Sequence, residues 1–378
     1  MTDAPRLAAE PTSDWDALAV ERPGGHVLQS RAWAEHRRAR GWTPLFAVAG
    51  DLRVLALTRS WPLVGGGSAY IPRGPAPTVP AESLGSVLWT VTKALAGTGI
   101  DVVAADPEVP AADPAWRAWL RRARFHPIDE IQPSRHRVTL PLDRSADEES
   151  VLAAIAKSTR QRIRKAEKQG VVVARHDARA PAAPGDGFAT AAEPAEAALD
   201  RFYDLLLETG ERRDFRFGPR RDFVAWWTRA LSAGHLVLLE ARDASRSGDP
   251  LAALILYRHG GRLSTVHSGD HAASRRSHPG APHLLRWRAI QLAIREGCTE
   301  MDLGGVDVPG ARREPVEGEA MHGLLQHKLS FGARWLELAG AHERVIRPNR
   351  YRAGRLLAGA ARRMPTGLAS RLPRGLRP

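Results

Sequence analysis

Cysteine is almost absent from this chain of 378 residues, because Cys298 is its single example. One cysteine excludes an internal disulfide and a thiolate cluster for a metal. No apolar run reaches the roughly 18 residues that a membrane-spanning helix needs. Residues 1–16 lack the apolar core of a secretory signal peptide. Together these absences predict a cytoplasmic protein.

Several catalytic motifs are also missing. The sequence contains neither the phosphate-binding pattern Gly-x-x-x-x-Gly-Lys-Ser/Thr nor the nucleophile pattern Gly-x-Ser-x-Gly. His267 and His271 are four residues apart but fall in an expected strand and turn, and His322 and His327 do not share one helical face. No zinc pattern is present. We therefore expect no metal and no bound cofactor.

The positive charge is concentrated at the C-terminal end. The formal net charge is +13, and residues 347–378 contain nine arginines and no acidic residue. Leu356, Leu357, Leu368 and Leu372 are interleaved with these arginines. Such a segment suits an anionic membrane surface or an RNA backbone, and it is equally typical of a partly disordered basic end.

Helix and strand patterns alternate in both halves of the chain. Expected helices are 30–40, 81–96, 114–123, 145–169, 194–211, 220–233 and 281–296, and expected strands are 43–49, 52–60, 100–105, 137–142, 171–175, 235–241, 250–258, 262–268 and 299–303. Residues 178–193 are rich in Ala, Pro and Gly and are expected to form a loop. Each half is therefore predicted to be a mixed α/β unit with antiparallel strands.

One lysine stands in an apolar frame. Lys328 is surrounded in sequence by Leu324, Leu325, Leu329 and Phe331. A cation in such surroundings is costly to leave unpaired and is suited to holding developing negative charge. Most lysines at helix ends are solvated, so this pattern alone does not establish a site.

The long helix expected at residues 145–169 carries a dense positive charge. Its basic residues are Lys157, Arg160, Arg162, Arg164, Lys165 and Lys168, opposed by Glu167 alone in that stretch. Arg160 and Arg164 are one turn apart and share a face, where their guanidinium groups could bind phosphate. The alternative is an ordinary solvated helix surface.

Three further segments place polar residues beside strands. Tyr70–Pro75 contains two prolines, so we expect an edge strand or a loop over a cleft, with Arg73 either facing a ligand or rigidifying a turn. Asp106 directly follows the buried strand 100–105, which suits either a site or a turn. Asp302 lies in a strand that ends at two glycines, which allow close approach of a ligand or a tight turn.

These segments, in this order, resemble the Fem family of peptidoglycan branch-forming aminoacyltransferases. The matching stretches are 28–35 with Gly41-Trp42, 70–75, 106–108, 157–171, 208–217, 302–305 and 327–332. The resemblance spans roughly residues 14–345. It implies two tandem acetyltransferase-like (GNAT-type) domains with mixed, largely antiparallel sheets. It also implies transfer of an amino acid from an aminoacyl-tRNA to the stem peptide of a cell-wall precursor.

The resemblance implies the following domain boundaries and partners. The first domain covers 1–144 and is completed by part of 318–346, the second covers 145–317, and 347–378 is a basic tail. Aminoacyl-tRNA is the co-substrate, and the acceptor is lipid II or UDP-MurNAc-pentapeptide. The tail favours the lipid-linked form and peripheral contact with the inner face of the plasma membrane.

The resemblance also assigns residue roles. Lys328 matches the family lysine that stabilises the charge of the reaction, and Asp106 matches an acceptor-site aspartate that has been regarded as a general base. Arg37 stands where the family has a phosphate-binding lysine. His267 stands where the family has a tyrosine near the acceptor. Tyr70, Arg73, Arg160, Arg164 and Asp302 are further candidate substrate-binding residues.

One family position is not matched directly. Gly218 stands where the family has a second phosphate-binding arginine, and Arg213 or Arg216 is the candidate replacement. Two other functions remain open from the sequence. The first is an acyl-CoA-dependent N-acyltransferase, although the nearest pyrophosphate-binding pattern, residues 38–43, lacks its last small residue. The second is a non-catalytic RNA- or membrane-binding protein.

Overall fold

The structure is a computed structural model, and the chain folds as two units. It describes residues 5–76, 80–132, 135–143, 145–180, 187–191, 193–212, 217–245, 248–306, 313–319 and 321–363. Unit 1 consists of residues 1–135 and 337–378, and unit 2 of residues 136–336. Arg213, Arg216 and the end of the basic tail lie outside the described residues.

Unit 1 is built on a mixed sheet of seven strands with the order β1-β2-β3-β4-β5-β14-β6. The strands are β1 (Arg6–Ala8), β2 (Thr43–Ala49), β3 (Leu52–Ser60), β4 (Gly67–Ile71), β5 (Ile100–Ala105), β6 (His126–Pro127) and β14 (His342–Val345). β4 and β5 are parallel, and the other pairs are antiparallel.

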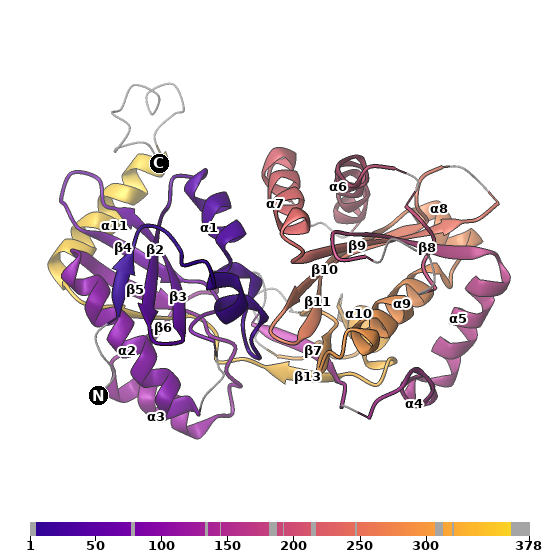
Figure 1. Cartoon of the computed structure of the whole chain (residues 1–378), viewed down its shortest axis with the longest axis horizontal. Helices are drawn as coiled ribbons and strands as arrows, with labels where there is room; N and C mark the ends of the chain where they lie inside the picture. The colour runs from indigo at the N-terminus through magenta and orange to yellow at the C-terminus, as the bar shows by residue number, and fades with distance from the viewer. Residues whose placement is uncertain are drawn as a thin grey trace. The chain divides into compact units, whose positions relative to one another are not determined.

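Helices cover both faces of this sheet, as the left part of Figure 1 shows. They are α1 (Arg31–Arg38), α2 (Ala81–Gly97), α3 (Pro114–Arg122) and α11 (Pro348–Arg363). Side chains of β3 alternate between two cores: Val54 packs with α2 and α3, whereas Leu55 packs with Trp15 and the α1 side. Ser30 caps α1 by accepting from the Trp33 backbone N–H at 3.0 Å.

Unit 2 has the same sheet plan, with the order β13-β7-β12-β11-β10-β9-β8. Its strands are β7 (His136–Pro141), β8 (Val171–Asp177), β9 (Leu236–Asp243), β10 (Ala252–His259), β11 (Arg262–Asp270), β12 (Glu300–Asp302) and β13 (Arg334–Glu337). β11 and β12 are parallel, in the way that β4 and β5 are parallel in unit 1.

The helices of unit 2 are also divided between the two faces of its sheet. They are α4 (Glu148–Ala154), α5 (Lys157–Lys168), α6 (Ala195–Glu211), α7 (Arg220–Ser232), α8 (Ala272–Ser277), α9 (Ala281–Arg295) and α10 (His322–Leu329). In Figure 1, α6 and α7 lie on the opposite face of β9–β11 from α9. Buried Leu284, Trp287 and Ile290 of α9 join Val237 and Leu239 of β9 in the core.

The helix expected at residues 145–169 is in fact two helices. α4 begins at a capping box in which Asp147 accepts from Ser150 N, and it ends at Ile155, whose backbone is extended. The chain turns here because the Ile155 side chain enters the core, with 1% exposure, while Ala156 N donates to Ser330 O at 2.9 Å. No glycine or proline marks this break in the sequence.

The structure also bears on the expectation for residues 70–75 and on the division of the chain. Residues 67–71 form the inner strand β4 between β3 and β5, and the two prolines follow that strand. The units divide at 135/136 and 336/337, whereas the expected first boundary was at 144/145, with the first domain completed by part of 318–346. The reason is that β7 pairs with β12 of unit 2, while β14 pairs with β5 of unit 1.

Candidate functional site

In each unit, some of the candidate residues lie at the carboxyl end of the parallel strand pair. In unit 1, Arg73 follows β4 and Asp106 follows β5. In unit 2, Asp302 ends β12 and Gly304 follows it. The ends of adjacent parallel strands meet at one edge of a sheet, which is the usual place for a site in such folds.

Asp106 organises the unit 1 cluster from a completely buried position, with 0% exposure. Its Oδ1 accepts from the Arg73 backbone N–H at 2.7 Å, and its Oδ2 accepts from Tyr70 Oη at 2.9 Å. Gln132 Nε2 donates to the same Tyr70 Oη at 3.0 Å. Any influence of this carboxylate on a substrate therefore passes through Tyr70 or Arg73.

Burial controls the proton affinity of this cluster. It raises the pKa of Asp106 to about 6, against the lowering effects of the Arg73 charge and of the hydrogen bonds from Arg73 N and Tyr70. Burial would lower the pKa of Arg73, but the charges of Asp106 and Glu108 raise it. Arg73 Nη1 lies 3.7 Å from Asp106 Oδ2. Tyr70 stays protonated because burial raises its pKa well above the ordinary value.

Arg37, on α1, is held between two indole rings. Its guanidinium carbon lies 5.4 Å from the Trp33 ring centroid and 5.1 Å from that of Trp42. Arg59 of β3 stacks on the same Trp42 ring at 5.0 Å. Burial, and then the charge of Arg59, lowers the pKa of Arg37, and its buried Nε has no hydrogen-bond partner among the described residues. Two guanidinium groups so close together favour a bound anion.

Arg59 was not identified from the sequence, although a signal for it exists. The β2–β3 hairpin pairs Ala49 with Leu52 and Thr43 with Thr58. Continuing this register by one residue places Trp42 opposite Arg59. The turn at Gly50 and the alternation of both strands were available from the sequence alone.

Lys328, on α10, is buried in unit 2, with 5% exposure. Its Nζ donates to Gly304 O at 2.8 Å and to Gly305 O at 3.0 Å. Both carbonyls follow β12, so the ammonium is fixed at the end of the parallel strand pair. The apolar frame expected from the sequence is confirmed by buried Leu325 and Phe331.

The turn that receives Lys328 depends on Asp302 and Gly304. Asp302 Oδ1 accepts from Gly304 N at 2.7 Å. Gly304 has φ +80, and a Cβ there would lie 2.7 Å from Thr265 O and 3.4 Å from Lys328 Nζ. Glycine is required here because of the positive φ and the close Thr265 carbonyl oxygen. In the structure Asp302 shapes the turn, and its predicted contact with substrate stays a prediction.

Lys328 belongs to a cluster of cations and neutral histidines around His327. The rings of His283 and His327 lie 4.6 Å apart, and Arg162 Nη1 is 3.2 Å from His283 Nε2. Burial first, and then nearby cations, lower the pKa of His327 to about 2 and that of His283 to about 4, so both are neutral at pH 7. Burial lowers the pKa of Arg286 to about 10, although the Asp302 charge raises it. The cluster is positive and suits an anionic ligand.

The remaining predicted residues occupy two other places in unit 2. His267 lies among the rings of Phe217, Phe223 and Trp227, with centroids 5.7–6.2 Å away. Burial alone lowers the pKa of His267 to about 4. It is therefore a neutral member of an aromatic cluster, and its predicted contact with the acceptor stays a prediction.

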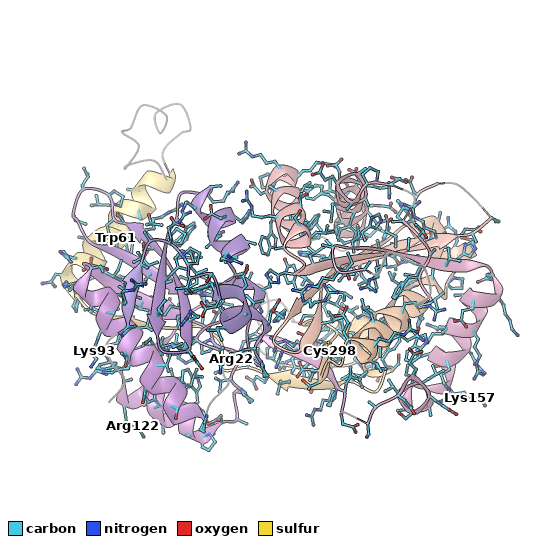
Figure 2. All side chains as sticks on the ribbon, in the orientation of Figure 1. Arg22, Trp61, Lys93, Arg122, Lys157 and Cys298 are labelled. Carbon is cyan, nitrogen blue, oxygen red and sulfur yellow. The ribbon has the colours of Figure 1, made fainter. Side chains whose placement is uncertain are left out.

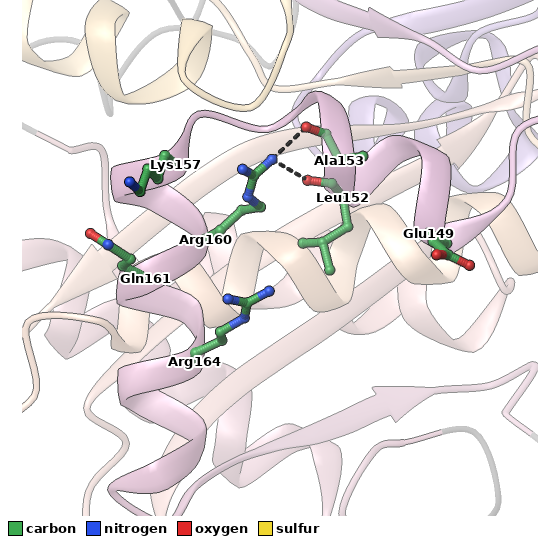
Figure 3. A pocket seen from close by; sticks show the side chains of 7 residues that line it. All are labelled: Glu149, Leu152, Ala153, Lys157, Arg160, Gln161 and Arg164. Atoms are coloured by element: carbon green, nitrogen blue, oxygen red, sulfur yellow. Dashed lines mark hydrogen bonds between the residues drawn. The ribbon is translucent and has the colours of Figure 1, made fainter.

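Arg160 and Arg164 line a surface cavity of about 490 Å³ beside α4 and α5, shown in Figure 3. Its other lining residues are Glu149, Leu152, Ala153, Lys157 and Gln161. Arg160 Nη1 donates to Ile155 O at 3.0 Å and also to Ala153 O at the end of α4. Arg160 thus satisfies helix-end carbonyls, whereas Arg164 and Lys157 give the cavity its charge. The predicted phosphate-binding role of Arg160 and Arg164 stays a prediction.

Two further features concern metals and membranes. Within the described residues, no group of three or more histidine, cysteine or carboxylate side chains is placed to hold a metal ion. No helix in the described part of the chain is long and apolar enough to cross a membrane.

Comparison with known proteins identifies the fold. Residues 154–313 match the family described as acetyltransferase (GNAT) domain. The structure of FemX superposes with a TM-score of 0.73 at 17% identity, covering 92% of this chain and 99% of that one. A protein of unknown function from Bacteroides thetaiotaomicron gives a TM-score of 0.51 at 14% identity, covering 92% and 100%. No curated protein sequence matches the chain.

The chain therefore has the fold of FemX, and residues 154–313 match a GNAT-type domain. The resemblance to the Fem family is confirmed at the level of fold. The expected acetyltransferase-like architecture with mixed, largely antiparallel sheets is confirmed as well.

Proposed function

We propose that this protein transfers an amino acid from aminoacyl-tRNA to the stem-peptide amine of a peptidoglycan precursor. The observation that carries the proposal is the buried Lys328 ammonium, fixed on Gly304 and Gly305 at the end of the parallel strands of a GNAT-type domain. The FemX fold and the order of the Fem-like sequence segments support it.

The reaction needs no covalent enzyme intermediate. The acceptor amine attacks the ester carbonyl, an amide bond forms, and the bond to the ribose oxygen of the tRNA breaks. The proton lost by the amine passes to that leaving oxygen. Negative charge develops on the former carbonyl oxygen, and a fixed ammonium such as Lys328 is worth about 3 kcal/mol there, the scale of one oxyanion donor.

In the proposal, unit 1 binds the acceptor. Arg37 and Arg59 offer two guanidinium groups around one indole ring, an arrangement suited to the diphosphate of a precursor. Asp106 acts as a positioning residue, because it is buried and holds Tyr70 Oη and the Arg73 backbone. Its role as a general base stays a prediction.

Unit 2 binds the donor in the same proposal. The positive cluster of Arg162, Arg286 and Lys328 suits the terminal phosphates of a charged tRNA, and Arg164 lies elsewhere on α5, in the cavity of Figure 3. Arg213 and Arg216 remain candidate phosphate ligands from the sequence. The precursor is proposed to be lipid II, met at the cytoplasmic face of the membrane.

An acyl-CoA-dependent N-acyltransferase is the second candidate. The match of residues 154–313 to an acetyltransferase domain favours it, and the positive cluster beside Lys328 also suits a pyrophosphate. The two candidates differ in the donor, since one depends on charged tRNA and the other on a thioester.

The test offers both donors at once. The protein is incubated with lipid II, a mixture of charged tRNAs and acetyl-CoA, and the lipid product is analysed by mass spectrometry. We expect a mass increase of one amino-acid residue. This product should not form when the charged tRNAs are digested with ribonuclease before the incubation. An acetyl adduct that survives ribonuclease would contradict the proposal and establish the second candidate.

A further inference from the structure

Unit 1 presents two strongly exposed leucines on neighbouring elements. Leu63 is 78% exposed and Leu356 is 76% exposed, the highest values among large apolar side chains in the described part of the chain. Leu63 lies in the turn between β3 and β4, and Leu356 lies on α11. Single exposed leucines are common on protein surfaces, so the packing of these two elements decides their meaning.

The turn and the helix meet at Trp61, which Figure 2 labels. The Trp61 and Tyr351 ring centroids are 6.3 Å apart. A Cβ added to Gly354 would lie 2.4 Å from the indole, so the α11 backbone rests directly on it. Trp61 Nε1 donates to Asp101 Oδ2 at 3.1 Å, and Arg350 Nη2 donates to Asp101 Oδ1 at 2.7 Å. The turn that carries Leu63 is therefore packed directly on α11, the helix that carries Leu356.

The turn holds its leucine at a conformational cost. Leu63 has φ 65, a left-handed conformation that leucine rarely adopts. Gly66, at φ +73, brings the turn against Asp101, because a Cβ there would lie 2.1 Å from Asp101 Oδ2. Asparagine or glycine would relieve the strain at position 63. A strained residue that exposes an apolar side chain points to a function for that side chain.

Positive charge lies beside Leu356 on α11. Arg352, Arg355 and Leu356 share one face of α11 through their i, i+3 and i+4 spacing, and all three are exposed. The described helix α11 contains five arginines and no acidic residue. Asp101 beneath the turn is already paired with Arg350. The charge of this surface is therefore complementary to a strongly anionic partner.

We infer that this surface docks on an anionic lipid bilayer. Leu63 and Leu356 enter the headgroup region, Arg352 and Arg355 bind lipid phosphates, and Trp61 lies at the interface, where tryptophan is enriched. RNA would use the arginines but would give the two exposed leucines no role. The inference stands independently of the proposed transfer reaction, because it concerns binding alone.

The test is co-sedimentation of the full chain with vesicles of phosphatidylcholine, with and without phosphatidylglycerol. We expect binding only to the anionic vesicles. The variant Leu63→Asn with Leu356→Ser should bind about tenfold more weakly or worse. Asparagine tolerates the left-handed conformation at position 63, so this variant should unfold at the same temperature as the wild type.

A second variant, Arg352→Gln with Arg355→Gln, should also bind about tenfold more weakly at low salt. The matched controls lie in unit 2: Val316→Ser removes an apolar side chain that is 56% exposed, and Arg221→Gln with Arg276→Gln removes the same charge. Both controls should bind vesicles like the wild type.

Three results would overturn the inference. The first is that the protein binds neutral and anionic vesicles equally well. The second is that the leucine substitutions leave vesicle binding unchanged. The third is that the Arg352/Arg355 variant loses tRNA binding but still binds vesicles like the wild type. The last result would assign the surface to RNA.

Discussion

Replacing Asp106 by asparagine should remove a loss of stability that the wild type suffers as the pH rises. The carboxylate is completely buried, and its two oxygens accept from Arg73 N and Tyr70 Oη. An asparagine carbonyl can still accept from Arg73 N and carries no charge to desolvate. The same substitution should reduce transfer, because it changes the group that orients Tyr70.

The size of the effect follows from the pKa of Asp106. Burial raises this pKa from 3.8 to about 6, so the folded state holds the proton more tightly than the unfolded chain does. The associated stabilisation is complete below the unfolded pKa and is lost as the pH rises through about 6. Between about pH 4.5 and about pH 7.5 the wild type should lose about 2 kcal/mol from this group.

Urea unfolding at these two pH values measures the effect. The free energy of unfolding of Asp106→Asn, taken relative to the wild type, should rise by about 2 kcal/mol from the lower to the higher pH. Asp51→Asn, which changes an exposed aspartate of unit 1, should show no such rise. A pH-independent difference for Asp106→Asn would refute the reasoning.

Two further predictions concern unit 1. Arg37→Gln and Arg59→Gln should each raise KM for the precursor about tenfold with little change in kcat, because each removes one charged contact to phosphate. Steady-state kinetics would measure this effect. A fall in kcat with an unchanged KM would contradict the prediction. Tyr70→Phe removes a hydrogen bond that lowers the pKa of Asp106, so the acidic limb of the pH–rate profile should move to higher pH. If the limb does not move, the ionisation of Asp106 does not control the reaction rate.

Most of the secondary structure was predictable because its signals are local. Ser30 caps α1 at the start of the helix expected at 30–40, and Gly50 and residues 259–261 lie in the hairpin turns between strands that were expected on either side. The break at Ile155 was not predictable, since it depends on a backbone hydrogen bond from Ala156 N to Ser330 O, and Ser330 is far away in the sequence. Local propensity contains no information about such a partner.

The candidate site was predictable only in part. The apolar frame of Lys328 indicated its burial, but its carbonyl partners follow from the position of α10 against the end of β12. Arg286 was not recognised from the sequence, because nothing local distinguishes it from an exposed arginine. Its burial follows from the packing of α9, which is buried on most of its sides. The complete burial of Asp106 likewise depends on tertiary packing.

The Lys328 ammonium is the centre of the account, and Lys328→Met removes it with little change in shape. Lys93→Met, at an exposed lysine of α2, is the matched control. Because a buried lysine also supports the Gly304–Gly305 turn, thermal unfolding of both variants must accompany the assay.

The most direct measurement is single-turnover transfer of a labelled amino acid from purified aminoacyl-tRNA to lipid II. The wild type and Lys93→Met should transfer at equal rates, and folded Lys328→Met should be at least about a hundredfold slower. Transfer by folded Lys328→Met at the wild-type rate would contradict the central claim.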